Sequence, residues 1–321
     1  MALERYYLLQ RSAMFLAVNL YYYLRCFRQV IKFRRKIGYF PNIALPKRYN
    51  EKFLWRKIFD TNPLFSVFCD KLATKEYIGS IVPELEIPTT LWSGTELDIA
   101  AYRLLGATTV LKANHGSSLN LFPADFEMGF EETRRRTDWW MTRDYWKSKM
   151  ETGYRGARKL IFIEELLRGK NPVVDVSVRV ANGKPLLLSC ITGNKTSGQR
   201  YGYFTCAGER LPCEVERVPK GMALDRDFAP PASIGKCVEY AAALGKEVDY
   251  ARYDFMVVDD RVYAGEITVY PASGLSTSDR RGLLGIFPIM NRDWDISTSY
   301  FFRSRSNPLL ERYKSLLKDC V

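Results

Sequence analysis

The feature that most limits the fold of this chain is a repeated pattern of two strand-like runs joined by a two-residue turn. The paired runs are residues 173–180 with 185–191, and residues 253–258 with 262–269. Asn182-Gly183 and Asp259-Asp260 lie between them, and residue pairs of this kind favour tight turns between antiparallel strands. The repeated strand–helix–strand order of a doubly wound parallel sheet is missing. The sequence therefore predicts an α+β fold that contains two hairpins.

Helical spacing and runs of β-branched residues predict further elements along the chain. Helices are expected over residues 50–59, 70–79, 126–149 and 233–244, and short strands over residues 87–92, 108–112 and 159–167. Asn50 is placed as the N-cap of the first of these helices, and Gly79 and Gly245 are placed to end the second and the last. The polar segment 192–203 is expected to be a loop.

Composition places the chain among ordinary globular proteins. Its 321 residues are 47% hydrophobic, which is enough to bury a core in one large domain or two small ones. The seven cysteines include no C-x-x-C pair and His115 is the single histidine, which argues against a disulfide framework and a structural zinc site. We therefore expect reduced thiols in a cytoplasmic protein.

Positive charge is concentrated at the N-terminus. The net charge of the chain is +12, and residues 1–50 hold ten Lys and Arg residues but a single acid, Glu4. The rest of the chain is therefore nearly balanced. A balanced body argues against a nucleic-acid partner, because such partners are bound by basic surfaces.

Residues 1–40 are expected to form basic amphipathic helices. Arg25, Arg28, Lys32 and Arg35 recur at three- and four-residue spacing, and Leu20, Leu24, Phe27 and Ile31 recur on another face. The apolar run over residues 13–24 is shorter than the roughly 20 residues that span a bilayer. Two interpretations stay open. The helix lies on an anionic membrane surface, which would place the protein peripherally at the inner membrane face, or its apolar side packs on the protein's own core.

A lysine at the end of a short strand precedes a loop of small residues. Lys112 ends an apolar run, and His115-Gly116-Ser117-Ser118 follows it. Glycine allows close backbone approach, while hydroxyls and exposed N–H groups can hold phosphate oxygens beside a fixed cation. The pattern suits a polyphosphate ligand, with an ordinary surface turn as the alternative. His115 could contact the ligand or cap the turn.

Two acids on the second hairpin form the sharper signal. Strand alternation places Arg252, Asp254 and Met256 on one face, and the returning strand can set Glu266 opposite Asp254. Two neighbouring carboxylates are costly to bury unless a cation binds them, and oxygen ligands favour magnesium that is shared with substrate phosphates. The phosphate loop and the acids together predict ATP binding. The alternative is that Asp254 pairs with Arg252 within the scaffold.

At these motifs the chain resembles the ATP-grasp superfamily, and within it the TupA-like amide ligases associated with teichuronopeptide and other surface-polysaccharide biosynthesis. The resemblance runs over residues 46–274, and the common nucleotide loops G-x-G-x-x-G and G-x-x-x-x-G-K-[ST] are absent from the sequence. In chain order, its motifs are YNEKFLW (49–55), CDKLATK (69–75), LKANHGSS (111–118), FIEELL (162–167), VDVS (174–177), VRVANGKP (178–185), RYDF (252–255) and GEITVYPASG (265–274).

The resemblance implies an ATP-grasp fold, in which two α+β subdomains clamp ATP and are preceded by N-terminal helices. A region of helical and α+β structure would cover residues 41–105, and a lid subdomain would cover 106–165. A subdomain for metal and substrate would cover 166–290, and a C-terminal tail helix would cover 291–321.

The resemblance also implies roles for individual residues. ATP would be held by Lys71, Lys112, His115, Gly116, Ser117, Ser118, Glu164, Glu165, Leu167 and Asp175. Asp254 and Glu266 would hold two Mg²⁺ ions, with Thr268 as a further candidate ligand at a position where many members carry Asn. The substrate would be bound by Arg252, Ser273 and Gly274. Arg252 is also a candidate catalytic residue, together with Lys195 and Arg200 from the loop 192–203, for which a solvated basic loop is the alternative.

The implied reaction is a two-step ligation, in which the γ-phosphate of ATP moves to a carboxylate and an amine then attacks the acyl phosphate. The carboxylate would belong to a small molecule or a glycan, such as a cell-surface polysaccharide or its precursor. Two other functions stay open, namely a sugar or carboxylate kinase and a non-catalytic nucleotide-binding protein. Ala272, at a position where glycine is common, predicts a stiffer substrate loop. The aromatic residues of segment 139–146 could stack on sugars or pack between helices.

Overall fold

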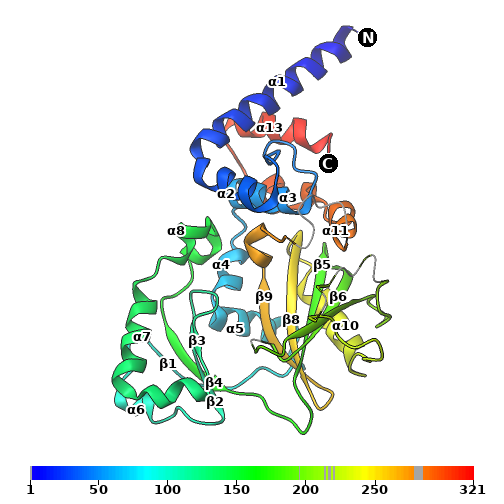
Figure 1. Cartoon of the computed structure of the whole chain (residues 1–321). Helices are drawn as coiled ribbons and strands as arrows, with labels where there is room; N and C mark the ends of the chain where they lie inside the picture. The colour runs from blue at the N-terminus through cyan, green and yellow to red at the C-terminus, as the bar shows by residue number, and fades with distance from the viewer. Residues whose placement is uncertain (1, 195, 213–214, 216–217, 220, 278–284) are drawn as a thin grey trace.

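The protein has three parts, which Figure 1 shows as a group of helices at the top and two β-sheets below it. The computed structural model describes residues 2–194, 196–212, 215, 218–219, 221–277 and 285–321. The smaller sheet lies at the lower left and the larger sheet at the lower right, with α4 (Leu64–Cys69) and α5 (Lys71–Ile81) between them. The first and last helices of the chain lie together at the top, so both ends contribute to the same part of the fold.

The larger sheet is antiparallel and has the strand order β7-β6-β5-β8-β9. Its strands are β5 (Val174–Ala181), β6 (Lys184–Thr192), β7 (Arg200–Phe204), β8 (Tyr250–Val258) and β9 (Arg261–Thr268). Helix α10 (Ile234–Leu244) packs against β5 and β6. Asn182-Gly183 joins β5 to β6 and Asp259-Asp260 joins β8 to β9, and all four turn residues have positive φ. Both predicted hairpins are confirmed.

The smaller sheet has the strand order β1-β4-β2-β3 and a hydrophobic core of its own. Its elements are β1 (Thr90–Gly94), α6 (Ile99–Tyr102), β2 (Thr109–Ala113), β3 (Asn120–Leu121), η1 (Pro123–Met128), α7 (Phe130–Thr142), α8 (Tyr145–Lys149), η2 (Thr152–Arg155) and β4 (Ile161–Glu165). Strand β1 pairs with β4, so this sheet begins before residue 106, where the sequence placed its boundary. The helix expected over 126–149 is divided into α7 and α8.

The helical part joins both ends of the chain around buried aromatic residues. Its elements are α1 (Ala2–Arg25), α2 (Phe27–Ile37), α3 (Tyr49–Phe59), α11 (Phe287–Asp293), η4 (Ile296–Thr298), α12 (Tyr300–Arg303) and α13 (Pro308–Lys318). Trp55 donates to the hydroxyl of Tyr313 at 3.0 Å, which links α3 to α13. Arg56 is fully buried and donates to Asp249 and to the carbonyl oxygen of Val269, both at 2.8 Å. Because a buried charge needs such partners, this pair fixes α3 to the ends of β8 and β9.

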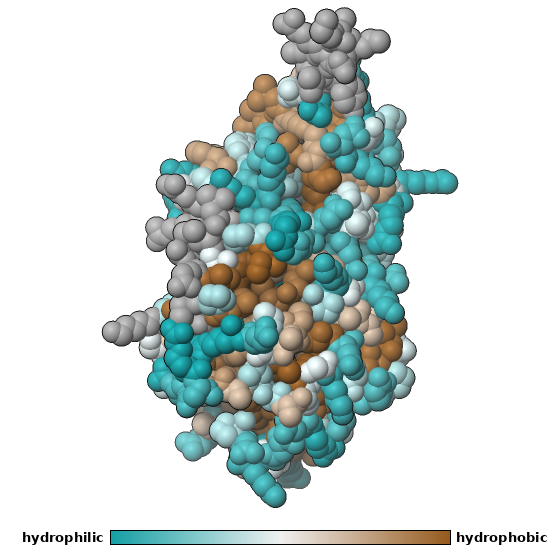
Figure 2. Space-filling model, turned by 90° about the vertical axis from the view of Figure 1, so that its right-hand side faces the viewer, coloured by the Kyte–Doolittle hydropathy of each residue, from teal (hydrophilic) through white to brown (hydrophobic). Residues whose placement is uncertain are grey.

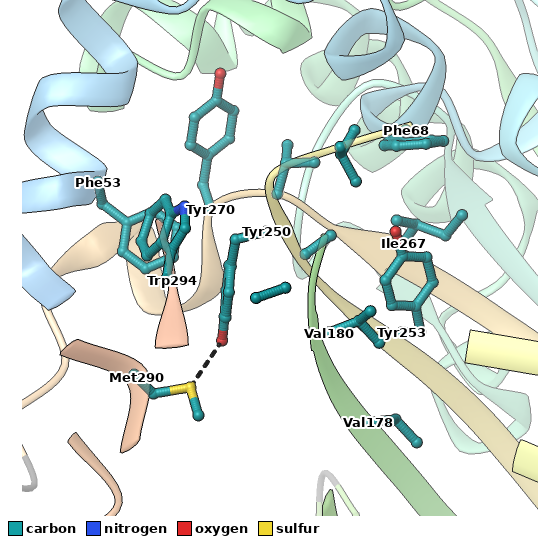
Figure 3. Packing of buried hydrophobic residues seen from close by; sticks show 14 of the residues in the cluster. Phe53, Phe68, Val178, Val180, Tyr250, Tyr253, Ile267, Tyr270, Met290 and Trp294 are labelled. Carbon is teal, nitrogen blue, oxygen red and sulfur yellow. Dashed lines mark hydrogen bonds between the residues drawn. The ribbon is translucent and has the colours of Figure 1, made fainter. Parts of the chain in front are cut away.

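An aromatic cluster continues this link into the core of the larger sheet, as Figure 3 shows. The rings of Tyr250 and Trp294 are stacked with their centroids 4.6 Å apart, and Phe53 packs against both. The Tyr250 hydroxyl donates to the sulfur of Met290 at 3.5 Å. Aromatic pairs of this kind contribute about 0.5–1.5 kcal/mol each beyond the burial of their surface. The strand that carries Asp254 therefore starts from a firmly packed end.

Two helix ends differ from the sequence prediction. Helix α3 begins at Tyr49, so Asn50 lies inside its first turn and is not the N-cap. Arg48 is the N-cap, and its backbone N–H donates to the carboxylate of Glu51 at 3.0 Å, while the N–H of Tyr49 donates to Asn291 at 2.6 Å. Helix α5 runs through Gly79 to Ile81, because packing in the folded protein outweighs the weak helix propensity of one glycine.

The N-terminal helices attach to the protein through a different face from the one that the sequence suggested. Helix α2 buries Val30, Phe33 and Ile37. The predicted apolar face is largely exposed: the relative accessibility is 61% for Leu20, 73% for Leu24 and 60% for Phe27. Figure 2 shows hydrophobic surface just below the N-terminal tip, over the N- and C-terminal helices. In the described part of the chain, no helix has both the length and the apolarity required to cross a membrane.

Candidate functional site

A cavity of about 510 Å³ lies between the two sheets, and residues of α5 and α8 also contribute to its lining. Eleven of the predicted site residues contribute to its lining. They are Lys71, Lys112, Ser117, Ser118, Glu164, Asp175, Arg252, Asp254, Glu266, Thr268 and Ser273. Residues separated by up to about 200 positions in the chain thus face one space, and each wall of that space has a distinct charge.

A β-bulge shapes the wall that belongs to the larger sheet. Arg252 on β8 pairs with Thr268 on β9. Between Tyr253 and Phe255 the register shifts, because β9 has one residue more than β8 in this stretch. A bulge reverses the alternation of a strand. Glu266 and Thr268 therefore share the face of Arg252 and Asp254. A Cβ atom on Gly265 would lie 2.4 Å from the carbonyl oxygen of Asp254, so the close approach at the bulge requires glycine.

One cation faces two carboxylates on this wall. The guanidinium of Arg252 donates to both oxygens of Asp254 at 2.7 and 2.6 Å and lies 3.7 Å from Glu266. The hydroxyl of Thr268 lies 3.3 Å from Asp254 and 3.2 Å from Glu266. Burial opposes the charge on Arg252, but Asp254 and Glu266 outweigh it and raise the pKa of the guanidinium. Asp254 therefore does pair with Arg252, which was the alternative to metal binding in the sequence analysis. Because one cation faces two carboxylates, the wall still has an excess of negative charge.

The wall that belongs to the smaller sheet has the opposite balance. Glu164 on β4 forms ion pairs with Lys75 from α5, at 2.8 Å, and with Lys112 from β2. Burial opposes the ionisation of Glu164, but Lys112 and Lys75 outweigh burial and lower the pKa of the carboxyl. Two ammonium groups share one carboxylate, so this side of the cavity keeps positive charge for an anionic ligand.

The loop after β2 is held from below by α5. The ammonium of Lys71 donates to the carbonyl oxygens of Ala113, at 2.8 Å, and Gly116. Burial lowers the pKa of Lys71 to about 8. Asn114 is buried and accepts from the backbone N–H of Leu72 at 2.9 Å. Lys71 thus organises the loop that presents Ser117 and Ser118, in addition to lining the cavity itself.

The loop after β9 has an uncommon backbone. Ala272, Ser273 and Gly274 have φ angles of 48°, 57° and 65°, which is the left-handed region that non-glycine residues seldom occupy. Lys57 from α3 holds this loop, because its ammonium donates to the carbonyl oxygen and the hydroxyl of Ser273 at 2.9 and 2.8 Å. The same ammonium donates to the carbonyl oxygen of Lys149 at 3.0 Å. The geometry of Ser273 at the cavity is therefore set by α3.

Six predicted site residues are described by the structure but do not line the cavity, and a seventh lies outside the described residues. The six are His115, Gly116, Glu165, Leu167, Arg200 and Gly274. Lys195 is not among the described residues. Gly116 supplies its carbonyl group to Lys71, and Gly274 packs on Phe53. These residues support neighbouring site residues through the backbone.

His115 and Glu165 point away from the cavity for local reasons. The ring of His115 is buried below the loop, with Nε2 at 3.0 Å from the carbonyl oxygen of Trp140 on α7. Burial lowers the pKa of His115, which favours the neutral ring. Glu165 follows Glu164 in β4 and so faces the other side of the sheet, where it accepts from the backbone N–H of Thr89 at 2.7 Å.

Arg200 is placed elsewhere because the segment expected to be a loop contains a strand. Residues Arg200–Phe204 form β7, in which Arg200 pairs with Thr192 of β6. The guanidinium donates to the carbonyl oxygen of Gly221, at the outer edge of the larger sheet. The sequence prediction of a loop over 192–203 was therefore wrong for its last residues, since pairing with β6 outweighs their polarity.

Three residues of the site were not assigned from the sequence. Lys75 completes the pair of cations around Glu164, Asn114 fixes the loop after β2, and Lys57 fixes the loop after β9. Lys75 follows Lys71 by four residues in α5, which places both on one helix face, so this spacing could have identified it. Lys57 offered no such signal, because its partners are distant in sequence.

The acidic wall fits a magnesium ion that is shared with a ligand. Within the described residues, no group of three or more His, Cys, Asp or Glu side chains is arranged to hold a metal. Asp254 and Glu266 supply two carboxylates, and the hydroxyl of Thr268 lies 3.3 Å from the first and 3.2 Å from the second. Magnesium commonly takes one or two carboxylates and completes its shell with water and phosphate oxygens. The donor set is therefore sufficient for magnesium when a phosphate is present.

Comparison with known proteins gives one family match. A model of the TupA-like ATP-grasp family matches residues 51–283. None of the curated proteins compared with the chain matches it.

Several solved structures are similar to the chain at low identity. D-alanine–D-alanine ligase from Bacillus anthracis, complexed with ATP, is 20% identical with a TM-score of 0.41, over 76% of this chain and 70% of that chain. The ATP-grasp ligase PsnB, complexed with a minimal precursor, is 15% identical with a TM-score of 0.36, over 68% of this chain and 60% of that chain. The ADP complex of purK, N5-carboxyaminoimidazole ribonucleotide synthetase, is 14% identical with a TM-score of 0.38, over 63% and 45%.

Proposed function

Because the chain belongs to the TupA-like ATP-grasp family, we propose that it is an ATP-dependent ligase that joins a carboxylate to an amine through an acyl phosphate. The family match covers residues 51–283 and confirms the predicted family and the predicted ATP-grasp fold. The observation that carries the proposal is the pair of opposed walls around one cavity, one with excess positive charge and one with excess negative charge. Such a cavity is complementary to nucleotide phosphates together with a divalent cation.

The positive wall is suited to the phosphates of ATP, which is a substrate of the proposed reaction. Lys112 and Lys75 supply charge beyond what Glu164 neutralises, and Ser117 and Ser118 supply hydroxyl and N–H donors at the cavity. Groups that are fixed before the reaction stabilise the charge that develops on the leaving ADP without reorganising. Asp175 also lines the cavity and is our candidate to bind the ribose of ATP.

The negative wall is suited to magnesium and to the acceptor. Asp254, Glu266 and Thr268 would hold Mg²⁺, which when bound neutralises phosphate charge and so assists transfer of the γ-phosphoryl group. Arg252 has a planar fork that can bind the acceptor carboxylate through two hydrogen bonds. An oxygen of that carboxylate attacks the γ-phosphorus as ADP leaves, and Arg252 would neutralise the acyl phosphate that results. The amine then attacks the acyl carbon, loses a proton and releases phosphate.

The acceptor carboxylate would belong to a cell-surface polysaccharide or its precursor. The motifs of this chain resemble the ATP-grasp branch associated with surface polysaccharides, and the family match supports that resemblance. We further propose that the protein is cytoplasmic and binds the anionic inner membrane face through α1 and α2. The observation that supports this is the exposed apolar ridge of Leu20, Leu24 and Phe27 beside a row of basic residues.

The ligase assignment is tested by measuring ADP and phosphate release from Asp254→Asn and Glu266→Gln proteins with pairs of carboxylates and amines. Each change removes one anionic oxygen ligand, and we expect ADP release to fall at least about 100-fold. Glu239→Gln on α10 removes an exposed carboxylate and serves as the matched control. Full activity of either variant contradicts the metal assignment. ADP release that does not depend on an amine identifies a kinase instead.

Membrane binding is tested by sedimentation with anionic and neutral vesicles. Replacing Leu20, Leu24 and Phe27 with serine should move the protein from the anionic vesicle fraction to the supernatant, since the apolar contacts are lost while the charge is kept. Replacing Leu309, which is exposed on α13, with serine is the matched control. Unchanged sedimentation of the triple variant contradicts membrane docking by this ridge and leaves the ligase assignment untouched.

A further inference from the structure

A second, smaller pocket opens beside the cavity and is rich in cations. It has a volume of about 200 Å³ and lies between α2, α3, α8 and the loop after β9. Five of its lining residues are basic, namely Arg28, Lys32, Lys57, Lys147 and Lys149, and no described lining residue is acidic. A pocket of this volume is smaller than the roughly 300–1,000 Å³ that enclose a whole small-molecule ligand. It is therefore suited to one end of a longer molecule.

Several of these cations have no counter-ion within the protein. Arg28, Lys32 and Lys149 form no ion pair with any described carboxylate. Lys147 pairs with Asp144, and the ammonium of Lys57 lies 3.6 Å from Glu151 and donates to three further oxygen acceptors. The pocket thus holds uncompensated positive charge in a concave surface, where the field of like charges adds up. This charge balance favours an anionic ligand.

The pocket adjoins the cavity between the two sheets. Lys149 and Ser273 line both spaces. The ammonium of Lys57 holds these two residues side by side through the carbonyl oxygen of Lys149 at 3.0 Å and that of Ser273 at 2.9 Å. A molecule whose carboxylate is bound at Arg252 can therefore extend past Ser273 toward Arg28 and Lys32.

We propose that this cationic pocket binds a second anionic group of the acceptor, so that the substrate carries at least two negative charges. This inference rests on the proposed ligase function, because it takes the reacting carboxylate to lie at Arg252. A chain of uronic acids and a uronic acid that bears a phosphate both have the required chemistry, since carboxylate and phosphate oxygens accept from the same ammonium and guanidinium donors. Lys57 acts as a positioning residue that holds Lys149 and Ser273 in place where the pocket meets the cavity.

The test is a binding measurement that needs no turnover. Wild-type protein with Mg²⁺ and ADP is titrated calorimetrically with glucuronic acid, digalacturonic acid and glucuronic acid 1-phosphate. We expect at least one of the two dianionic probes to bind about tenfold more tightly than glucuronic acid, with a preference that weakens as salt is added. The dianionic probe that is preferred identifies the second group as a carboxylate or a phosphate.

Two paired variants separate the pocket from general charge. The double variant Arg28→Gln, Lys32→Gln on α2 should abolish the preference for the dianion. The double variant Lys147→Gln, Lys149→Gln on α8 should reduce this preference. Arg35→Gln with Lys36→Gln removes the same charge from α2 outside the pocket and should leave the preference unchanged. A wild-type protein without the preference, or an Arg28 and Lys32 variant that keeps it, overturns the proposal. Loss of ligase activity alone does not produce either result, so the two proposals fail separately.

Discussion

The two walls of the cavity carry opposite arrangements of charge. On the smaller sheet, one carboxylate, Glu164, is shared by the ammonium groups of Lys75 and Lys112. On the larger sheet, one guanidinium, Arg252, is shared by Asp254 and Glu266. Each wall is mostly neutralised and keeps about one unit of charge. Ion pairs within each wall fix its charged side chains, yet one wall keeps an unpaired positive charge and the other an unpaired negative charge. A ligand that carries both signs of charge, such as a phosphate with a divalent cation, complements both walls.

The largest effect should come from removing the excess cation of the positive wall. Lys112→Met keeps the length and apolar stem of the side chain but leaves Glu164 with Lys75 alone. We expect kcat/KM for ATP to fall by about 100- to 1,000-fold, which is typical of removing one fixed electrostatic donor. Lys170→Met, at an exposed lysine, is the control. Less than a threefold change in ATP-dependent ADP release would contradict the role of this wall.

Changing the shape of the single cation on the negative wall should have the next largest effect. Arg252→Lys keeps the charge but cannot form the bidentate contact, so kcat/KM for the acceptor carboxylate should fall by about 100-fold. The KM for ATP should change less than threefold. Arg179→Lys is the matched control, because Arg179 pairs with Arg252 on the next strand and does not line the cavity. Equal losses in both variants would show that the effect is structural.

Removing the shared carboxylate of the positive wall should lower the stability of the protein but increase its stabilisation by ATP. Glu164→Gln leaves Lys75 and Lys112 without their anion, and we expect the free energy of unfolding to fall by about 1–3 kcal/mol. ATP should then stabilise the variant more than the wild type, because the wall is more positive. Glu165→Gln, one residue along on the other face, is the control. Thermal unfolding with and without ATP measures both effects, and a variant that is as stable as the wild type contradicts the prediction.

The smallest expected effect is a dependence on pH through Lys71. Burial lowers its pKa to about 8 from an ordinary value of 10.5, so the free enzyme loses this proton as pH rises through about 8. We expect kcat/KM for ATP to decline several-fold above that pH, and Lys71→Arg should move the decline to higher pH. The contribution to stability has the opposite sign. Between pH 8 and 10.5 the unfolded chain binds more protons at this lysine than the folded one, so stability rises with pH. A decline that Lys71→Arg does not move would exclude Lys71 as its cause.

Much of the fold could be predicted from short-range patterns. Asn182-Gly183 and Asp259-Asp260 fix their turns through their own backbone preferences, so the hairpins were readable without knowledge of the partners. The placement of Arg252 and Asp254 on one strand face followed from alternation alone. These predictions succeeded because each depends on residues that are close together in the chain.

The remaining features depend on contacts between distant residues. The bulge at Gly265 exists only against β8, and β7 exists only because β6 offers an open edge. The burial of His115 requires the carbonyl group of Trp140 on α7. Hydrophobic spacing identified an amphipathic helix at the N-terminus, but it could not show that Val30 and Phe33, rather than Leu24 and Phe27, meet the core.

The three consecutive left-handed residues after β9 have a consequence for how the active protein comes into being. Ala272 and Ser273 would leave this conformation in a free peptide, where each costs roughly 1–2 kcal/mol. What retains it is helix α3, through the ammonium of Lys57 and the contact of Gly274 with Phe53. Since α3 lies more than 200 residues earlier in the chain, the loop takes this conformation only once residues 49–59 have packed against it. The conformation of the loop therefore depends on long-range folding and is not fixed by the sequence of the loop itself.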